Sequence, residues 1–321
     1  MHAIQVSEHG GPEVLNYVEV PDPRIGPDEV LVDTEAIGIN FIDTYIRTGR
    51  YPQAVPYVPG AEGTGVVAEV GANATEFAVG DRVAWAAAPG SYAHRVAVPA
   101  AVAVKVPAGI DAPVAASALL QGMTAHYLIE SIYKPEPGET VLVHAGAGGV
   151  GLLLTQLAVA RGVRVITTVS SDAKEKLSRE AGATEVLRYT DDLAEQVRAR
   201  TDGVGVAAVY DGVGAATFEA SLASLRVRGM LALFGAASGP VPPFDLQRLS
   251  PAGSLFVTRP TLAHYTRDRA ELLWRATDIL AAIANGTLHV RIGATYPLAE
   301  AEQAHRDLEG RKTTGSIVLL P

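Results

Sequence analysis

Short apolar runs bounded by turn residues dominate the first part of the chain. Within residues 1–120, runs such as Glu29–Val32 and Gly65–Val70 are rich in Val and lie between Gly, Pro and Asp residues. Valine favours strands, whereas Gly, Pro and Asp favour turns. This part of the chain is therefore predicted to form short β-strands.

From Glu139 onward, apolar runs alternate with amphipathic segments. Such alternation is typical of a parallel sheet built from βαβ units. The sequence therefore predicts an α/β fold here, with helical stretches between the strands. The predicted strands are Thr140–His144, Val163–Thr168, Val186–Tyr189, Val206–Tyr210 and Met230–Phe234.

The end of the chain combines both patterns. A long helical segment is predicted near Leu262–Asn285, and β-like runs follow at Leu288–Val290 and Gly315–Leu320. We therefore expect the tail to rejoin the first, β-rich domain. The sequence shows no fixed-period repeat and no low-complexity tract.

Composition narrows the possible functions of the 321-residue chain. It has 26 Lys and Arg against 35 Asp and Glu, so its net charge is 26 − 35 = −9. This acidic balance argues against nucleic acid or an anionic membrane as the main partner. The chain has no Cys, which excludes disulfides, Cys-ligated metals and thiol nucleophiles.

The N-terminus and one apolar stretch bear on localisation. Residues 1–6 lack the basic region and apolar core of a signal peptide, so we expect a cytoplasmic protein. Val141–Ala160 is apolar, but it contains four Gly together with His, Thr and Gln. A buried strand, turn and helix explain this stretch better than a membrane span.

A glycine-rich turn joins a predicted strand to a predicted helix. Gly146, Gly148 and Gly151 fit the spacing G-x-G-x-x-G, which permits a tight turn and brings a pyrophosphate close to the helix N-terminus. The motif alone could be an ordinary glycine turn, but the βα repeats around it favour a dinucleotide site. No Lys-Ser or Lys-Thr follows the glycines, so the turn is not a P-loop, and no G-x-S-x-G is present.

The end of the next predicted strand indicates which dinucleotide binds. An enzyme that uses NAD usually has an acidic residue there, whereas Ser170, Ser171, Lys174 and Tyr189 suit a 2′-phosphate. NADPH is therefore favoured over NADH. Asp172 is the alternative acid, but its position suits a helix N-cap better. Lys174 alone could be a solvated helix charge.

Several unlike motifs occur in a characteristic order along the chain. Gly38–Pro52, Pro59–Val67, Gln121–Ala125 and Ala145–Gly151, with Val257–Pro260 and Gly310–Gly315, resemble the zinc-free quinone oxidoreductase branch of the medium-chain dehydrogenase/reductase superfamily, which includes zeta-crystallin. The resemblance covers essentially the whole chain. It implies a doubly wound Rossmann domain at residues 121–264 and a GroES-like β-rich domain at residues 1–120 and 265–321.

The resemblance also bears on metals. Zinc-dependent members of the superfamily hold a catalytic metal with a Cys and a His, and a lobe with four Cys holds a structural one. Here Asn40 follows Gly38-Ile39, and Pro89–Ala93 passes directly where the lobe would be inserted. The eight His residues show no paired ligand spacing, so no metal is expected.

The resemblance further implies the cofactor and reaction sites. It places the nicotinamide in a cleft between the domains, near Gln121 among others. Asn40 could instead cap the following helix, Tyr45 and Tyr51 could be packed aromatics, and Arg259 and Arg311 could be surface cations. Glu62 is expected to support the fold or the site. Hydroxyl and amide donors expected to stabilise charge on the acceptor are Asn40, Tyr45, Tyr51 and Thr124. The residues expected at the cofactor are Asn40, Ile42, Asp43, Thr44, Tyr127, Gly146, Gly148, Gly149, Val150, Gly151, Leu152, Ser170, Ser171, Lys174, Tyr189, Val213, Phe234, Gly235, Ala236, Val257, Thr258, Arg259 and Arg311.

The leading interpretation is an NADPH-dependent quinone reductase that transfers a hydride, or single electrons, without zinc. Reduction of an activated C=C bond in an enone or alkenal needs the same hydride geometry and is the nearest alternative. A non-catalytic NADPH-binding protein is the third. A homodimer is also expected, with Met230–Phe234 and Gly253–Val257 as candidate contact segments.

Overall fold

The computed structural model describes residues 1–321, which form two compact units. The first unit comprises residues 1–123 and 266–321, and the second comprises residues 124–265. The limits expected from the sequence lie close to these. The tail lies in the first unit because its last strand hydrogen-bonds to a strand from the N-terminal part of the chain.

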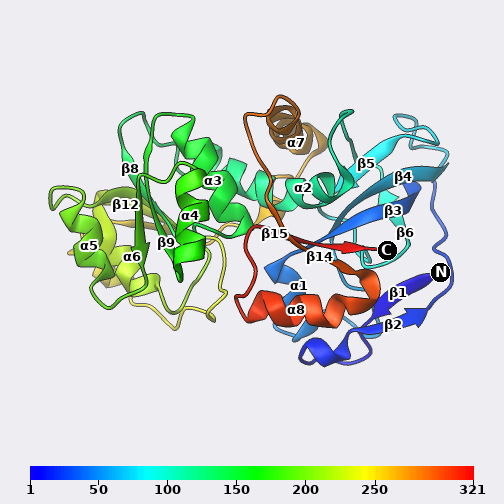
Figure 1. Ribbon diagram of the computed structural model, residues 1–321, viewed down its shortest axis with the longest axis horizontal. Coiled ribbons are helices and arrows are strands. Elements are labelled where there is room, and N and C mark those ends of the chain that lie inside the picture. The colour runs from blue at the N-terminus through cyan, green and yellow to red at the C-terminus, as the bar shows by residue number, and fades with distance from the viewer. The chain divides into compact units, whose positions relative to one another are not determined.

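The first unit is β-rich. Its main sheet has the order β14-β15-β3-β4-β5-β7, with β6 also paired to β3, and every pairing except β14 with β15 is antiparallel (Figure 1). A separate antiparallel pair joins β1 and β2. The strands are β1 (His2–Gln5), β2 (Asn16–Glu19), β3 (Glu29–Ile39), β4 (Glu62–Val70), β5 (Arg82–Trp85), β6 (Arg95–Pro99), β7 (Val104–Lys105), β14 (Ile292–Pro297) and β15 (Ser316–Leu320).

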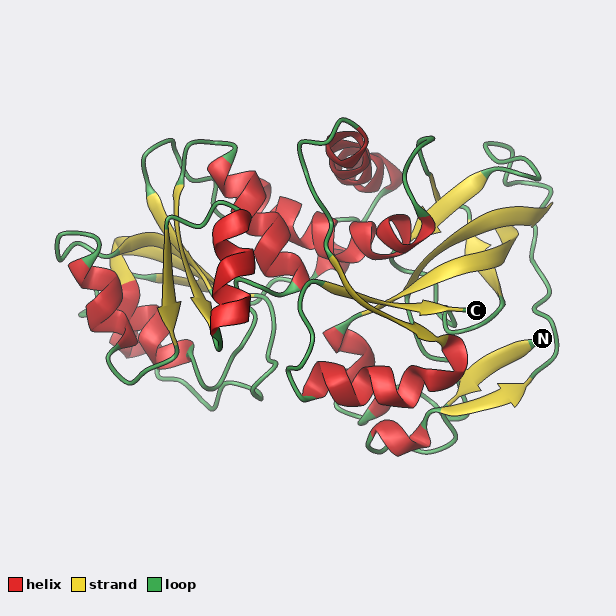
Figure 2. Ribbon diagram, viewed as in Figure 1, coloured by secondary structure: helices red, strands yellow, loops and turns green.

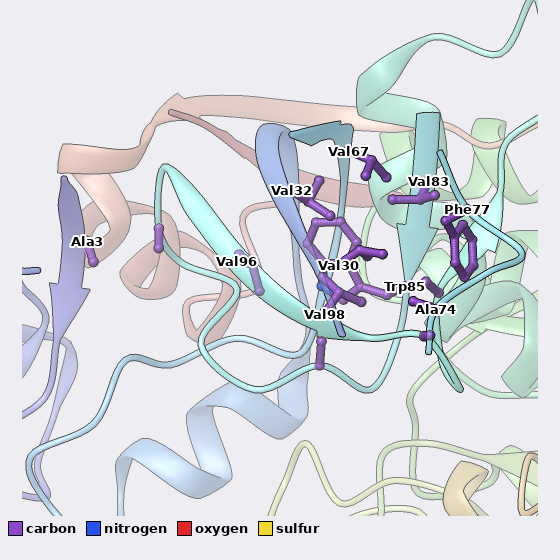
Figure 3. Packing of buried hydrophobic residues seen from close by; sticks show 14 residues of the cluster. Ala3, Val30, Val32, Val67, Ala74, Phe77, Val83, Trp85, Val96 and Val98 are labelled. Atoms are coloured by element: carbon purple, nitrogen blue, oxygen red, sulfur yellow. The ribbon is translucent and has the colours of Figure 1, made fainter. Parts of the chain in front are cut away.

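Alternating residues of these strands form the core of the first unit. Figure 3 shows Val30 and Val32 of β3 packed with Val67, Val83, Val96 and Val98 around the indole of Trp85. Trp85 is fully buried, and its indole N–H donates a 2.9 Å hydrogen bond to the Ser91 hydroxyl. Burial of these side chains holds the sheet that carries the N-terminus of helix α1.

Four longer helices belong wholly or partly to the first unit: α1 (Phe41–Arg47), α2 (Ala112–Tyr127), α7 (Arg269–Ala284) and α8 (Ala301–Glu309). The division between the units falls within α2. The helix predicted at Leu262–Asn285 is shorter than expected, because the Asp268 carboxylate caps α7 by accepting the N–H of Glu271 (2.9 Å). A short 3-10 turn covers Leu262–His264.

The strand predicted at Leu288–Val290 is absent, and β14 begins at Ile292 instead. The backbone N–H groups of Thr287 and Leu288 both donate to the carbonyl of Ala282 (2.9 and 3.0 Å). This segment is therefore tied to the C-terminal end of α7 and cannot enter the sheet.

The second unit contains one parallel sheet with the order β10-β9-β8-β11-β12-β13. Helices α3 and α4 cover one face, and α5 and α6 cover the other (Figures 1 and 2). The predicted doubly wound α/β fold is therefore confirmed. Its elements are β8 (Thr140–Val143), α3 (Gly149–Val159), β9 (Arg164–Val169), α4 (Asp172–Glu180), β10 (Glu185–Arg188), α5 (Leu193–Ala199), β11 (Val206–Asp211), α6 (Phe218–Ser224), β12 (Leu225–Leu233) and β13 (Phe256–Thr258).

One of the two segments expected at a dimer contact lies inside this sheet. Met230–Leu233 belongs to β12, which pairs with β11 on one side and β13 on the other. Its backbone groups are therefore already used. Of the two expected segments, only Gly253–Val257, which overlaps the edge strand β13, can offer an open edge. No helix combines the length and apolar character that a membrane crossing requires.

Candidate functional site

The glycine turn of the second unit lies between β8 and α3, as the sequence predicts. A Cβ on Gly146 would lie 2.5 Å from the Cβ of Thr167, and a Cβ on Gly151 would lie 2.3 Å from the carbonyl oxygen of Ala145. Only glycine fits both positions. Helix α3 begins directly after Gly148, so the N–H groups of its first turn, from Gly149 onward, have no partner within the helix. Such a helix N-terminus attracts the phosphates of a nucleotide.

Tyr189 lies beside this turn. Its hydroxyl oxygen accepts the backbone N–H of Ala145 (2.9 Å), and its ring stacks on His144 with a centroid separation of 6.0 Å. Because Tyr189 directly follows β10, this contact joins the end of β10 to the glycine turn. The structure thus brings together two groups of predicted cofactor residues that are distant in sequence.

Ser170 and Ser171 follow β9 and are exposed. The expected N-cap at Asp172 is wrong, because Ser171 occupies the N-cap and its hydroxyl oxygen accepts the N–H of Lys174 (3.4 Å). Asp172 is the first residue of α4 instead. Its carboxylate accepts a 2.7 Å hydrogen bond from Arg188.

Arg188 is a residue that the sequence analysis missed. It is the last residue of β10, it pairs in register with Val169, and its guanidinium contacts both Asp172 (2.7 Å) and Glu175 (2.6 Å). The carboxylate of Asp172 is therefore paired with a cation, and Ser170 and Ser171 occupy the end of β9, where an NAD enzyme would use an acid. The sequence signal for Arg188 was its position immediately before Tyr189, which was predicted to lie at the cofactor.

Asp211 holds the loop that follows β11. Its carboxylate accepts the N–H groups of Val213 (2.8 Å) and Gly214 (3.0 Å) and the hydroxyl groups of Thr217 and Ser221 (2.8 Å each to Oδ2). The loop that carries Val213 is thereby fixed at the carboxyl end of β11. In an open parallel sheet, ligands bind at this end of the strands.

The loops after β11 and β12 approach each other closely. A Cβ on Gly235 would lie 2.4 Å from the carbonyl oxygen of Gly212, and Phe234 donates its N–H to the carbonyl of Asp211 (2.9 Å). Val213, Phe234, Gly235 and Ala236 are therefore assembled at one end of the sheet. Val257 and Thr258 lie on the neighbouring strand β13, and Arg259 follows it with its guanidinium bonded to the carbonyl of Pro260 (3.2 Å).

Thr124 and Tyr127 lie in the last turn of α2 and belong to the second unit. Both side chains are buried. The Tyr127 ring stacks on the Tyr265 ring at 4.6 Å, with 11° between the ring planes. Tyr127 is thus a packed aromatic residue within its own unit, and a contact with the cofactor stays a prediction.

In the first unit, the predicted residues gather at the N-terminus of α1. Asn40 occupies the N-cap, as expected, and forms a capping box with Asp43. Its Nδ2 also donates to Glu62 (2.7 Å), and its Oδ1 accepts from Gln121 (3.1 Å). The backbone N–H of Asn40 donates to the Asp43 carboxylate (2.8 Å). The side chain of Asn40 is therefore also held by two groups outside the helix.

Asp43 belongs to a buried polar network. Its carboxylate accepts the hydroxyl of Tyr92 (3.0 Å), and burial raises the pKa of Asp43 to about 6. Arg47 donates to Nδ1 of His305 (2.8 Å), so Nε2 carries the ring proton and donates to Tyr92 Oη (3.0 Å). Burial, and then the positive charge of Arg47, lower the pKa of His305 to about 3. Arg47 also pairs with Glu309.

The remaining predicted residues of the first unit differ in exposure. Thr44 is buried, and its hydroxyl donates to the carbonyl of Phe41 (2.7 Å). Ile42 and Tyr51 are each 37% exposed, and the Tyr51 ring meets the Tyr45 ring edge-on at 5.7 Å. Arg311 has a φ of 57° just after α8, and its backbone N–H donates to the carbonyl of Leu308 (3.1 Å).

Both domain models that match the chain come from one superfamily. Residues 26–108 match the alcohol dehydrogenase GroES-like domain, and residues 149–273 match the zinc-binding dehydrogenase domain. A quinone oxidoreductase of Pseudomonas aeruginosa is 46% identical over 321 residues, which cover 99% of each chain. A 2-haloacrylate reductase of a Burkholderia species is 42% identical over 328 residues, which cover 99% of this chain and 98% of the other. A mycobacterial protein solved as a complex with NADPH is 57% identical, with a TM-score of 0.98 and full coverage of both chains.

These matches define the class of the protein as a medium-chain dehydrogenase/reductase with a GroES-like and a Rossmann domain. Within that class, the chain belongs to the quinone oxidoreductase family. The resemblance identified from the motifs is therefore confirmed over the whole chain.

The residues of this chain do not fit the zinc ion that gives the second domain model its name. The chain has no Cys, and no three His, Asp or Glu side chains are grouped as a metal site requires. At the position of the metal-binding Cys, the Asn40 side chain is bonded to Glu62 and Gln121. Amide groups bonded in this way are poor zinc ligands.

Proposed function

We propose that this protein is an NADPH-dependent quinone reductase. The observation that carries the choice of cofactor is the ion pair after β9, where Arg188 binds Asp172 beside Ser170, Ser171 and Lys174. The similarity to quinone oxidoreductases supports the quinone as acceptor. A pair of hydroxyl groups and two cations suits a 2′-phosphate and disfavours a bare ribose. The NADPH complex of the mycobacterial relative supports the same cofactor.

When bound, NADPH supplies a hydride, and the chain supplies binding and orientation. The first turn of α3 would hold the pyrophosphate, and the loops fixed by Asp211 and Gly235 would border the nicotinamide half. Asn40, Tyr45, Tyr51 and Thr124 stay the proposed donors to the acceptor oxygen on which negative charge develops. A quinone is itself an electrophile, so this reaction needs no nucleophilic side chain.

Reduction of an activated C=C bond is the second candidate function. It is supported by the 2-haloacrylate reductase, which is nearly as similar to this chain as the quinone oxidoreductase of Pseudomonas aeruginosa. Initial rates with 1,4-benzoquinone and with 2-chloroacrylate, at equal NADPH, separate the two. A larger kcat/KM for the quinone supports the main proposal, and a larger value for the haloacrylate replaces it with the second.

The open edge of β13 supports a homodimer, in which a second copy pairs with this strand. Phe256 and Val257 on β13 are 56% and 37% exposed, and the edge is not covered by any other strand of the chain. An uncovered edge strand is a template for pairing with another chain. Light scattering should give twice the chain mass of 33.5 kDa, and a mass of one chain would contradict the dimer.

The absence of Cys supports a place in the reducing cytoplasm.

A further inference from the structure

Four buried side chains of the first unit form one continuous chain of hydrogen bonds. The Ser316 hydroxyl donates to Oε1 of Gln121 (2.8 Å), and Nε2 of Gln121 donates to Oδ1 of Asn40 (3.1 Å). Nδ2 of Asn40 then donates to Oε2 of Glu62 (2.7 Å). These residues come from β15, α2, the end of β3 and β4, and each is less than 10% exposed.

The direction of this hydrogen-bond chain is set at Glu62. An ionised carboxylate can only accept hydrogen bonds, so Asn40 must turn its amide nitrogen toward it. The other carboxylate oxygen, Oε1, accepts the backbone N–H of Leu120 (2.7 Å). With the nitrogen of Asn40 fixed, its oxygen faces Gln121, and Gln121 in turn must present its oxygen to Ser316.

This arrangement leaves one donor of Asn40 unused. The amide nitrogen has two hydrogens, and only the one directed at Glu62 has a partner in the chain. The backbone N–H of Asn40 donates to Asp43 and does not involve the side-chain nitrogen. The second N–H is therefore available to a bound molecule.

We propose that Glu62 is a positioning residue, which orients Asn40 through this chain of hydrogen bonds so that the free N–H of Asn40 donates to the acceptor oxygen that becomes negative. The inference rests on the proposed function, since that function supplies the developing charge. A donor held in place before the reaction stabilises such charge without reorganisation.

Protonation of Glu62 reverses the chain of hydrogen bonds. Because Oε1 accepts the N–H of Leu120, the proton resides on Oε2 and meets a donor at Asn40. Asn40 must then turn over to present its oxygen, Gln121 must turn for the same reason, and the Ser316 hydroxyl becomes an acceptor. Each of these three groups can donate and accept, so the reversed chain keeps all three of its hydrogen bonds. The side-chain oxygen of Asn40 then faces Glu62, where its amide nitrogen, with the free N–H, lay before.

The surroundings of Glu62 favour this reversal at moderate pH. Burial, opposed by its hydrogen bonds and assisted by the charge of Asp43, raises the pKa of Glu62 to about 8. Asp43 is linked through Tyr92 to His305 and Arg47, and no cation contacts Glu62 itself. The elements packed around Glu62 add no further charge. Helix α2 carries no Asp, Glu, Lys or Arg. On the neighbouring strands, Gly38 of β3 lies opposite Glu62, and Trp85 of β5 lies opposite Gly63.

Glu62→Gln tests the proposal, with Glu69→Gln as the matched control. The introduced glutamine must offer its oxygen to Leu120 and its nitrogen to Asn40, which locks the reversed direction, whereas Glu69 is an exposed residue of the same strand. For the wild type, kcat/KM for the quinone should rise with pH through the ionisation of Glu62. Glu62→Gln should lie at the low-pH level of the wild type at every pH, about 10- to 100-fold below its high-pH level, and Glu69→Gln should follow the wild type.

A second measurement reads the hydrogen bonds without turnover. The side-chain amide NMR signals of Asn40 and Gln121, assigned through Asn40→Asp and Gln121→Glu, should shift together between about pH 6 and about pH 10 in the wild type. They should not titrate in Glu62→Gln. Constant amide signals in the wild type, or an unchanged pH profile in Glu62→Gln, would overturn the proposal. If the wild type does not oxidise NADPH with a quinone, the proposed function fails, and the amide titration still decides the role of Glu62.

Discussion

The Tyr92 hydroxyl donates a 3.0 Å hydrogen bond to the Asp43 carboxylate within a buried network that also contains Arg47. It also accepts from His305 (3.0 Å), so a single oxygen links an acid near the N-terminus of α1 to a helix near the end of the chain. Residues 43, 92 and 305 are fully or almost fully buried. The tail is therefore attached to the first domain by polar contacts as well as by the pairing of β15 with β3.

Replacing Tyr92 with Phe should destabilise the protein. The change leaves the Asp43 carboxylate and His305 Nε2 without one buried partner each, which we expect to cost about 1–3 kcal/mol in the free energy of unfolding. Tyr57→Phe is the matched control, because the Tyr57 hydroxyl is buried without any hydrogen-bond partner. Urea unfolding of both variants checks this, and equal losses would show that the hydroxyl of Tyr92 contributes nothing specific.

Stability should depend on pH through Glu62. Its pKa is raised by burial from 4.5 to about 8, so the folded state binds the proton more tightly than the unfolded state. The resulting stabilisation is complete below the unfolded pKa and is lost as the pH rises through the folded pKa. Between about pH 5 and about pH 9, the free energy of unfolding should therefore fall more steeply with pH in the wild type than in Glu62→Gln.

Comparing the wild type with Glu62→Gln also removes the effect of His305, which changes stability with pH in the opposite direction. The lowered pKa of His305 makes the folded state bind fewer protons, so its effect reduces stability as the pH falls below the ordinary value of a histidine. This contribution is common to both proteins and cancels in the difference. Parallel stability curves for wild type and Glu62→Gln would contradict the predicted role of Glu62 in the pH dependence.

Much of the fold could be predicted from local sequence, but the polar contacts could not. The apolar runs of the second unit and the spacing of Gly146, Gly148 and Gly151 predict the sheet and the turn because these signals are local. The partner of Asn40 was not predictable, since Glu62 is distant in sequence and any polar residue could have faced it. Asp172 was misassigned as the N-cap because Ser171, directly before it, is an equally good capping residue, and its ion pair with Arg188 was not predictable because it depends on the register of β9 and β10.

The glycine turn should tolerate a side chain at one position and not at another. In Gly151→Ala the new Cβ would meet the backbone oxygen of Ala145 at 2.3 Å, whereas in Gly148→Ala it would meet the same oxygen at 3.2 Å. We expect Gly151→Ala to lose about 1–3 kcal/mol of stability, and Gly148→Ala to lose clearly less. Thermal unfolding without cofactor measures both. A larger loss in Gly148→Ala would mean that the turn is shaped differently.

The preference for NADPH should depend on Lys174 and Arg188. Loss of one charge-assisted hydrogen bond to the 2′-phosphate should weaken NADPH binding about 10- to 100-fold in Lys174→Ala or Arg188→Ala and leave NADH binding unchanged. Lys176→Ala is the control, because Lys176 is exposed and lies near Glu180 (3.9 Å). Equilibrium titration of both cofactors checks this. An equal loss for NADPH and NADH would indicate damage to the fold and no contact with the phosphate.

The most direct test of the account is the initial rate of NADPH and NADH oxidation with 1,4-benzoquinone, measured before and after treatment with a chelator. We expect rapid oxidation of NADPH, much slower oxidation of NADH, and no loss of rate after chelation, because Arg188 pairs with Asp172 and no metal-binding set of side chains exists. Equal rates with both cofactors, a rate abolished by the chelator, or no oxidation of NADPH at all would contradict the account.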